Sequence, residues 1–70
     1  MKRTKLLKQV RRWAKDNAVH FEVDQIKGKG SHVRVFVDDR STIVKHGELS
    51  SAYVYLVLKQ LGIPKDEIKR

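Results

Sequence analysis

Hydrophobic positions along the chain recur first at helical spacing, then alternate with polar ones, and then return to helical spacing. Near the N-terminus they fall on one side of a helical wheel, with basic residues on the other, which is typical of an amphipathic helix. Residues 19–24 and 32–37 alternate between apolar and polar side chains, as half-buried strands do. The turn residues DDRS lead into STIVK at 41–45, which we interpret as a third strand, and the helical period returns from residue 48. The pattern therefore predicts a helix, three strands and a second helix.

Each predicted element has one apolar side, and these sides define the expected core. The second strand would contribute its valines, and each helix would cover them with an apolar arc. Short connections favour an antiparallel meander, and a chain of 70 residues supports one core, because it buries only roughly 60% of its unfolded surface. We therefore expect a single α+β domain over residues 1–70, with both helices on one face of a three-stranded antiparallel sheet. The helical core residues would be Leu6, Leu7, Val10, Trp13 and Ala14, and then Tyr53, Val54, Val57, Leu58 and Leu61.

Serine, glycine and proline mark the ends of the second helix. Ser50 or Ser51 can cap its start, because a side-chain oxygen satisfies an otherwise unpaired backbone amide. Gly62 followed by apolar Ile63 is typical of a Schellman ending. Pro64 suits the first position of a further short turn.

The charge of the chain is positive and unevenly distributed. Sixteen Lys and Arg residues against eight Asp and Glu give a net charge of +8. Residues 1–34 hold ten basic and three acidic residues, whereas residues 35–70 hold six and five. This asymmetry favours a polyanionic partner, most often nucleic acid, with a merely solvated surface as the alternative. On the first helix the candidate RNA-contacting residues are Lys8, Arg12 and Lys15.

The composition also argues against several classes of protein. No apolar run approaches the ~18 residues of a membrane span, and no membrane partner is expected. The first sixteen residues lack the apolar stretch of a secretion signal, so we expect a cytoplasmic protein. The chain has no cysteine, and Asp38 and Asp39 fall in a turn, so we expect neither a metal site nor a cofactor.

A histidine follows a basic, glycine-rich loop, at the start of the second strand. If the valines of this strand face the helices, then His32, Arg34 and Phe36 face away from them, and His32 is not a core histidine. Imidazole is the side chain best suited to proton transfer near neutral pH, which cleavage of RNA through its 2′-hydroxyl requires. Positive side chains and glycine-rich backbone could bind the phosphate. The expected RNA contacts here are Lys27, Gly28, Lys29, Gly30, Ser31 and Arg34.

Five short motifs, in order and at suitable spacing, resemble those of the HicA family, the small toxins of bacterial toxin–antitoxin modules. Together they cover nearly the whole chain. They are KLLKQ at 5–9, GSH at 30–32, Lys45-His46, Glu48-Leu49 and LKQLGI at 58–63.

This resemblance implies a fold, an activity and a partner. The fold would be the α-β-β-β-α arrangement of a double-stranded-RNA-binding domain. The activity would be that of a metal-independent endoribonuclease that cuts mRNA and so inhibits translation, with His32 as its catalytic residue. A HicB-type antitoxin protein would neutralise it. Lys45 and His46 are auxiliary candidates, and a capping or phosphate-contacting role ahead of the second helix is the favoured alternative for His46.

One alternative function and one further prediction remain at this level. A non-catalytic module could use the same fold and charge to bind duplex RNA by its shape. On the second helix, Ala52, Tyr55 and Leu56 lie outside the apolar arc, which predicts a protein interface. Weak self-association or a wider core would explain the same residues.

Overall fold

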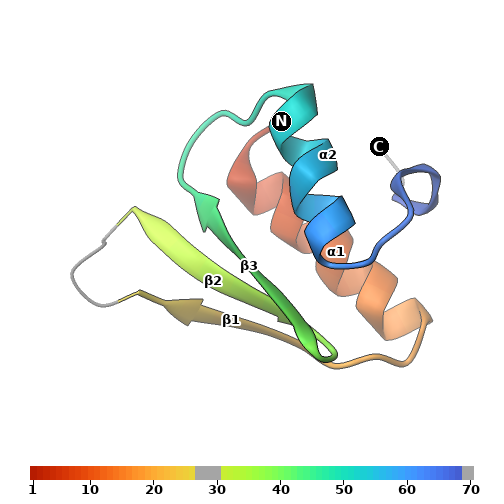
Figure 1. Cartoon of the computed structure of the whole chain (residues 1–70). Helices are drawn as coiled ribbons and strands as arrows, with labels where there is room; N and C mark the ends of the chain where they lie inside the picture. Colours follow the sequence, from red (N-terminus) through yellow and green to blue (C-terminus); the bar gives the residue numbers. More distant parts are fainter. Residues whose placement is uncertain (27–30, 69–70) are drawn as a thin grey trace.

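The computed structural model describes residues 1–26 and 31–68 and shows a two-layered α+β domain (Figure 1). Both helices lie on one side of a three-stranded sheet, as the sequence predicts. The order α-β-β-β-α agrees with a double-stranded-RNA-binding-domain-like fold, and a single 3₁₀ turn, η1, follows among the described residues. The elements are α1 (Arg3–Asp16), β1 (Phe21–Gln25), β2 (His32–Val37), β3 (Arg40–Lys45), α2 (Ser51–Gln60) and η1 (Lys65–Glu67).

The sheet is antiparallel with β2 at its centre. Val33, Val35 and Val37 of β2 are buried, whereas the residues between them are half-buried or exposed. This alternation confirms that the valines face the helices. The first strand starts at Phe21 rather than at Val19. Phe21 is half-buried and the other residues of β1 are exposed, because β1 lies at the edge of the layer that the helices cover.

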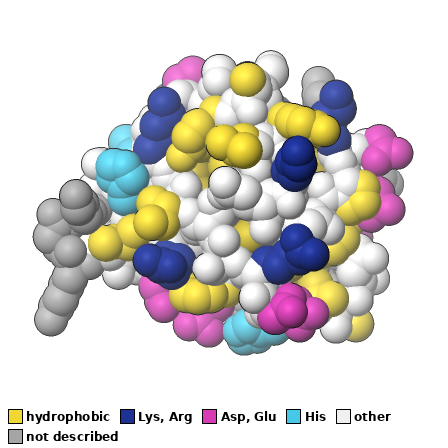
Figure 2. Space-filling model, in the orientation of Figure 1, with side chains coloured by type: hydrophobic (Ala, Val, Ile, Leu, Met, Phe, Trp, Pro, Cys, Tyr) yellow, Lys and Arg dark blue, Asp and Glu magenta, His cyan; other side chains and the backbone are white. Residues whose placement is uncertain are grey.

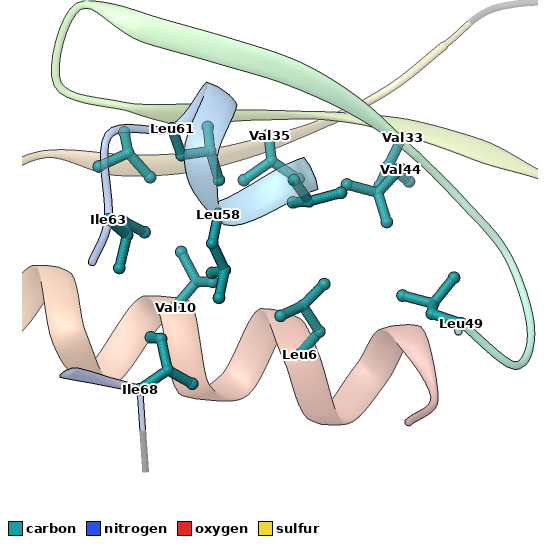
Figure 3. Close-up of a cluster of buried hydrophobic side chains, with 12 residues drawn as sticks. Leu6, Val10, Val33, Val35, Val44, Leu49, Leu58, Leu61, Ile63 and Ile68 are labelled. Carbon is teal, nitrogen blue, oxygen red and sulfur yellow. The ribbon is translucent and has the colours of Figure 1, made fainter. Parts of the chain in front are cut away.

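The core fills the space between the sheet and the helices. Leu6 and Val10 of α1 are fully buried and point toward the valines of β2 and β3 (Figure 3). From α2 and the segment after it, Leu58, Leu61 and Ile63 enter the same cluster. Burying a leucine or valine side chain is worth about 1.5–3 kcal/mol, so this cluster is the main source of stability. Of the predicted helical core, Leu7, Trp13, Tyr53 and Val54 are half-buried at its margin.

Both helices end in Schellman motifs, although only one has glycine at the left-handed position. After α2, Gly62 (φ 73°) donates to the carbonyl of Lys59 and Ile63 donates to that of Leu58, as predicted. After α1, the left-handed residue is Ala18 (φ 56°). Its N–H donates to the carbonyl of Lys15 at 3.2 Å, and the N–H of Val19 donates to the carbonyl of Ala14 at 2.9 Å. A sequence without glycine there gives no sign of this ending.

Local hydrogen bonds fix the remaining ends. The Ser50 hydroxyl accepts a hydrogen bond from the N–H of Tyr53 at 3.1 Å, which confirms the cap of α2. Pro64 lies just before η1 rather than within it. The indole N–H of Trp13 donates to a Glu67 carboxylate oxygen at 2.8 Å and so holds η1 against α1. No helix in the described part of the chain combines the length and apolar character needed to cross a membrane.

Candidate active site

The face of the sheet turned away from the helices presents one row of side chains from each strand. His32, Arg34 and Phe36 form the central row, which confirms the orientation expected for them. In antiparallel strands, directly opposite residues project to the same face. The flanking rows are therefore Glu22 and Asp24 on β1, and Ser41, Ile43 and Lys45 on β3. We call this surface the open face.

His32 is the first residue of β2 and lies at one end of the open face. Its ring is half-buried, and the Ser31 hydroxyl oxygen lies 3.2 Å from Nδ1. A hydrogen bond between the Ser31 hydroxyl and Nδ1 leaves the other ring nitrogen, Nε2, for proton transfer. An imidazole that is partly held and still accessible to solvent can act as a general acid or base.

Lys45 is the residue directly opposite His32, on β3. The neighbouring pair, Ser31 and His46, is joined by a hydrogen bond from the His46 N–H to the Ser31 carbonyl at 2.8 Å. Because hydrogen-bonded and non-hydrogen-bonded pairs alternate along antiparallel strands, His32 and Lys45 form a non-hydrogen-bonded pair, the kind in which side chains come closest. The register therefore places Lys45 directly across from His32 on the neighbouring strand.

Tyr53 of α2 fixes this end of β3 from its outer edge. Its hydroxyl donates to the Ile43 carbonyl at 3.4 Å and accepts from the Lys45 N–H at 3.1 Å. The Lys45 ammonium lies 4.9 Å from the centre of the Tyr53 ring, within the range of a cation–π interaction. One tyrosine thus holds both the backbone and the side chain of Lys45.

Arg3, which the sequence analysis did not single out, also reaches this end of the sheet. Its guanidinium donates to the Ser31 carbonyl at 3.2 Å. Its own N–H donates to the carbonyl of Gly47, a residue with φ 97° that suits glycine. Ser31 and Gly47 are far from Arg3 in the chain, with sequence separations of 28 and 44. Nothing in the local sequence pattern therefore reveals these two contacts.

The segment after β3 is tied to the start of the chain by charge as well. The N-terminal ammonium of Met1 donates to a Glu48 carboxylate oxygen at 2.6 Å and to the Leu49 carbonyl at 3.1 Å. This hydrogen bond and the positive charge of the ammonium hold the pKa of Glu48 below its ordinary value of 4.5, and Lys2 adds a smaller attraction. The ion pair helps to hold the start of α1 against the segment that follows β3.

The basic side of α1 lies on the opposite side of the domain. Lys8, Arg12 and Lys15 are exposed, and on the helical wheel they lie opposite Leu6 and Val10, which point toward the sheet. The helix layer and the sheet itself therefore separate these three residues from the open face. The structure does not combine them with His32 into one surface.

The other predicted site residues separate in the same way. Arg34 lies on the open face, two residues from His32. His46 is exposed and lies in the bend after β3, where its backbone N–H donates to the Ser31 carbonyl. The predicted RNA contacts at Lys27, Gly28, Lys29 and Gly30 lie outside the described residues. Within residues 1–26 and 31–68, no three histidine or carboxylate side chains are grouped so that they could hold a metal ion.

Charge varies across the open face. The β1 row is acidic, the central row holds His32 and Arg34, and the β3 row ends in Lys45. An anion that approaches this face is attracted to its β2–β3 side and repelled from β1.

Comparison with known proteins found no match to a family model, to a curated protein or to a solved structure.

Proposed function

We propose that this protein is a metal-independent endoribonuclease that cuts mRNA and so inhibits translation, acting in the cytoplasm. The observation that supports it best is the pair of His32 and Lys45, in which a histidine that is only half-buried lies directly opposite a lysine across β2 and β3. The HicA-like motifs support the same activity, since their GSH histidine corresponds to His32.

The proposed reaction needs one proton acceptor and a source of positive charge. The neutral imidazole of His32 accepts the proton of a ribose 2′-hydroxyl, and the freed oxygen bonds to the adjacent phosphorus. The bond from phosphorus to the 5′-oxygen breaks, and that oxygen takes a proton from water or from the imidazolium. Lys45 and Arg34 stabilise the extra negative charge on the phosphorane. The products are a 2′,3′-cyclic phosphate and a 5′-hydroxyl.

Substitution of His32 tests this function. His32→Ala should lower the rate of RNA cleavage by about 10²–10⁴-fold, the usual contribution of a general acid or base. His20→Ala is a matched control, because His20 is an exposed histidine that pairs with Glu22 at the surface. Cleavage should also persist in excess EDTA. Wild-type rates in His32→Ala, or activity lost to EDTA and restored by magnesium, would contradict the proposal.

A protein partner of the HicB antitoxin type belongs to this proposal. Tyr55 and Leu56 of α2 are 51% and 49% exposed, so they are not part of a wider core. Hydrophobic side chains reach the surface among Lys and Arg side chains on the side where α2 and β3 lie (Figure 2). The Lys65 ammonium lies 5.4 Å from the centre of the Tyr55 ring. Apolar residues beside cations fit an acidic protein with apolar anchors.

A second candidate function, non-catalytic binding of duplex RNA, is favoured by the basic side of α1. Lys8, Arg12 and Lys15 project together from the side of the domain opposite His32. Changing all three to Gln should weaken binding of a non-cleavable duplex and flatten its dependence on salt, because fewer counterions are released. An unchanged slope of log affinity against log salt would show that this side is only solvated.

A further inference from the structure

The central row of the open face is spaced like a single-stranded nucleic acid. His32, Arg34 and Phe36 are successive residues on one face of β2. Such residues are about 7 Å apart along a strand, a distance that one nucleotide of an extended single strand can span. A guanidinium plane and an aromatic ring are both groups on which nucleobases stack. A row of imidazole, guanidinium and phenyl groups therefore offers one phosphate position and two base positions.

The rows on either side restrict how a nucleic acid can lie on this surface. Glu22 is opposite Phe36 and Asp24 is opposite Arg34, so the β1 side carries two carboxylates. On the β3 side, Ser41, Ile43 and Lys45 contribute no negative charge. Phosphates are repelled from the first side and tolerated on the second. The sugar-phosphate chain would then run over β2 and β3, with its bases turned toward the sheet.

We infer that the open face binds single-stranded RNA, with a phosphate at His32 and the next two bases stacked on Arg34 and Phe36. This inference rests on the proposed function, because it treats His32 as the position of the scissile bond. It names the substrate as an unpaired stretch of RNA. In a duplex the bases are stacked on one another and cannot lie flat on side chains of the sheet.

The half-buried ring of Phe36 provides the sharpest test. Binding is measured with a 2′-O-methyl RNA hexamer, which lacks the attacking hydroxyl and cannot be cleaved. Phe36→Leu should weaken binding of this hexamer about 5- to 150-fold, the range for loss of one stacked base. Phe36→Trp should retain it, because the larger ring still stacks. Phe21→Leu is the matched control: it removes the other phenylalanine, which lies opposite Val37 on the helix side of the sheet, and should change affinity less than twofold.

A second measurement uses the wild-type protein and does not depend on how well variants fold. A hexamer carrying photoreactive 4-thiouridine should cross-link to β2 at Arg34 or Phe36. Cross-links confined to α1, wild-type affinity in Phe36→Leu, or an equal loss of duplex binding in that variant would overturn the inference. If the open face bound a protein partner instead, Phe36→Leu would bind the hexamer with wild-type affinity. Failure of the proposed function alone would appear differently, as normal cleavage by His32→Ala with hexamer binding still dependent on Phe36.

Discussion

The Tyr53 hydroxyl hydrogen-bonds to the backbone of Lys45, and the Tyr53 ring lies beneath the ammonium of the same lysine. This contact joins α2 to the outer edge of β3, where strand backbone would otherwise be unpaired. It also holds the ammonium of Lys45, whose backbone lies opposite His32, over the Tyr53 ring. The helix therefore contributes to the candidate active site without facing it.

Loss of the Lys45 charge should slow cleavage while the protein stays folded. Lys45→Gln is expected to lower the rate about 10- to 100-fold, because one of the positive groups that stabilise the phosphorane is removed. Lys59→Gln, which removes an exposed lysine from the last turn of α2, is the control and should cleave normally. Equal rates in the two variants, measured at equal folded concentration, would show that Lys45 has no part in the reaction.

The two left-handed residues at the helix ends should respond in opposite directions. Ala18→Gly should stabilise the protein by about 0.5–1 kcal/mol, because a Cβ is unfavourable at positive φ and this gain exceeds the extra freedom of glycine when unfolded. Gly62→Ala should destabilise it by about 1–2 kcal/mol. An added Cβ there would also lie 3.0 Å from Arg40 Cδ. Urea unfolding midpoints at unchanged m-values measure both effects, and a destabilised Ala18→Gly would contradict this account of α1.

The ion pair at Glu48 predicts a pH-dependent contribution to stability. Because the pKa of Glu48 is lowered in the folded protein, its stabilising effect is present above 4.5 and is lost as the pH falls through the folded pKa. Glu48→Gln should therefore lower Tm at pH 7. The difference from the wild type should disappear at pH 3. A difference that is the same at both pH values would show that the carboxylate charge contributes nothing.

The exposed residues of α2 should matter for a protein partner and not for the fold. Tyr55→Glu combined with Leu56→Ser should weaken binding of an acidic antitoxin at least tenfold, because tyrosine and apolar anchors dominate such interfaces. Cleavage and Tm should stay near wild-type values, since both side chains are about half exposed. Unchanged partner binding, or a protein that changes from dimer to monomer in sedimentation, would assign these residues to another role.

Much of the fold could be predicted because it depends on local patterns. Alternation in residues 32–37 correctly placed the three valines inside and His32 outside, since successive side chains of a strand point to opposite faces. Helical periodicity identified Leu6 and Val10 as core residues. Ser50 and Gly62 marked the ends of α2 because each residue type has a local backbone preference. The ending at Ala18 was missed, because alanine has no such preference.

Only the tertiary structure decided what surrounds His32. Its opposite residue is Lys45, and not His46, because the two-residue turn at Asp38 and Asp39 pairs Val37 with Arg40 and so sets the register between β2 and β3. Arg3 arrives beside Ser31 because packing places the start of α1 at this end of the sheet. The basic side of α1 points away because its apolar side must face the core. The sequence determined which side chains are exposed, and the packing of residues distant in the chain determined which of them meet.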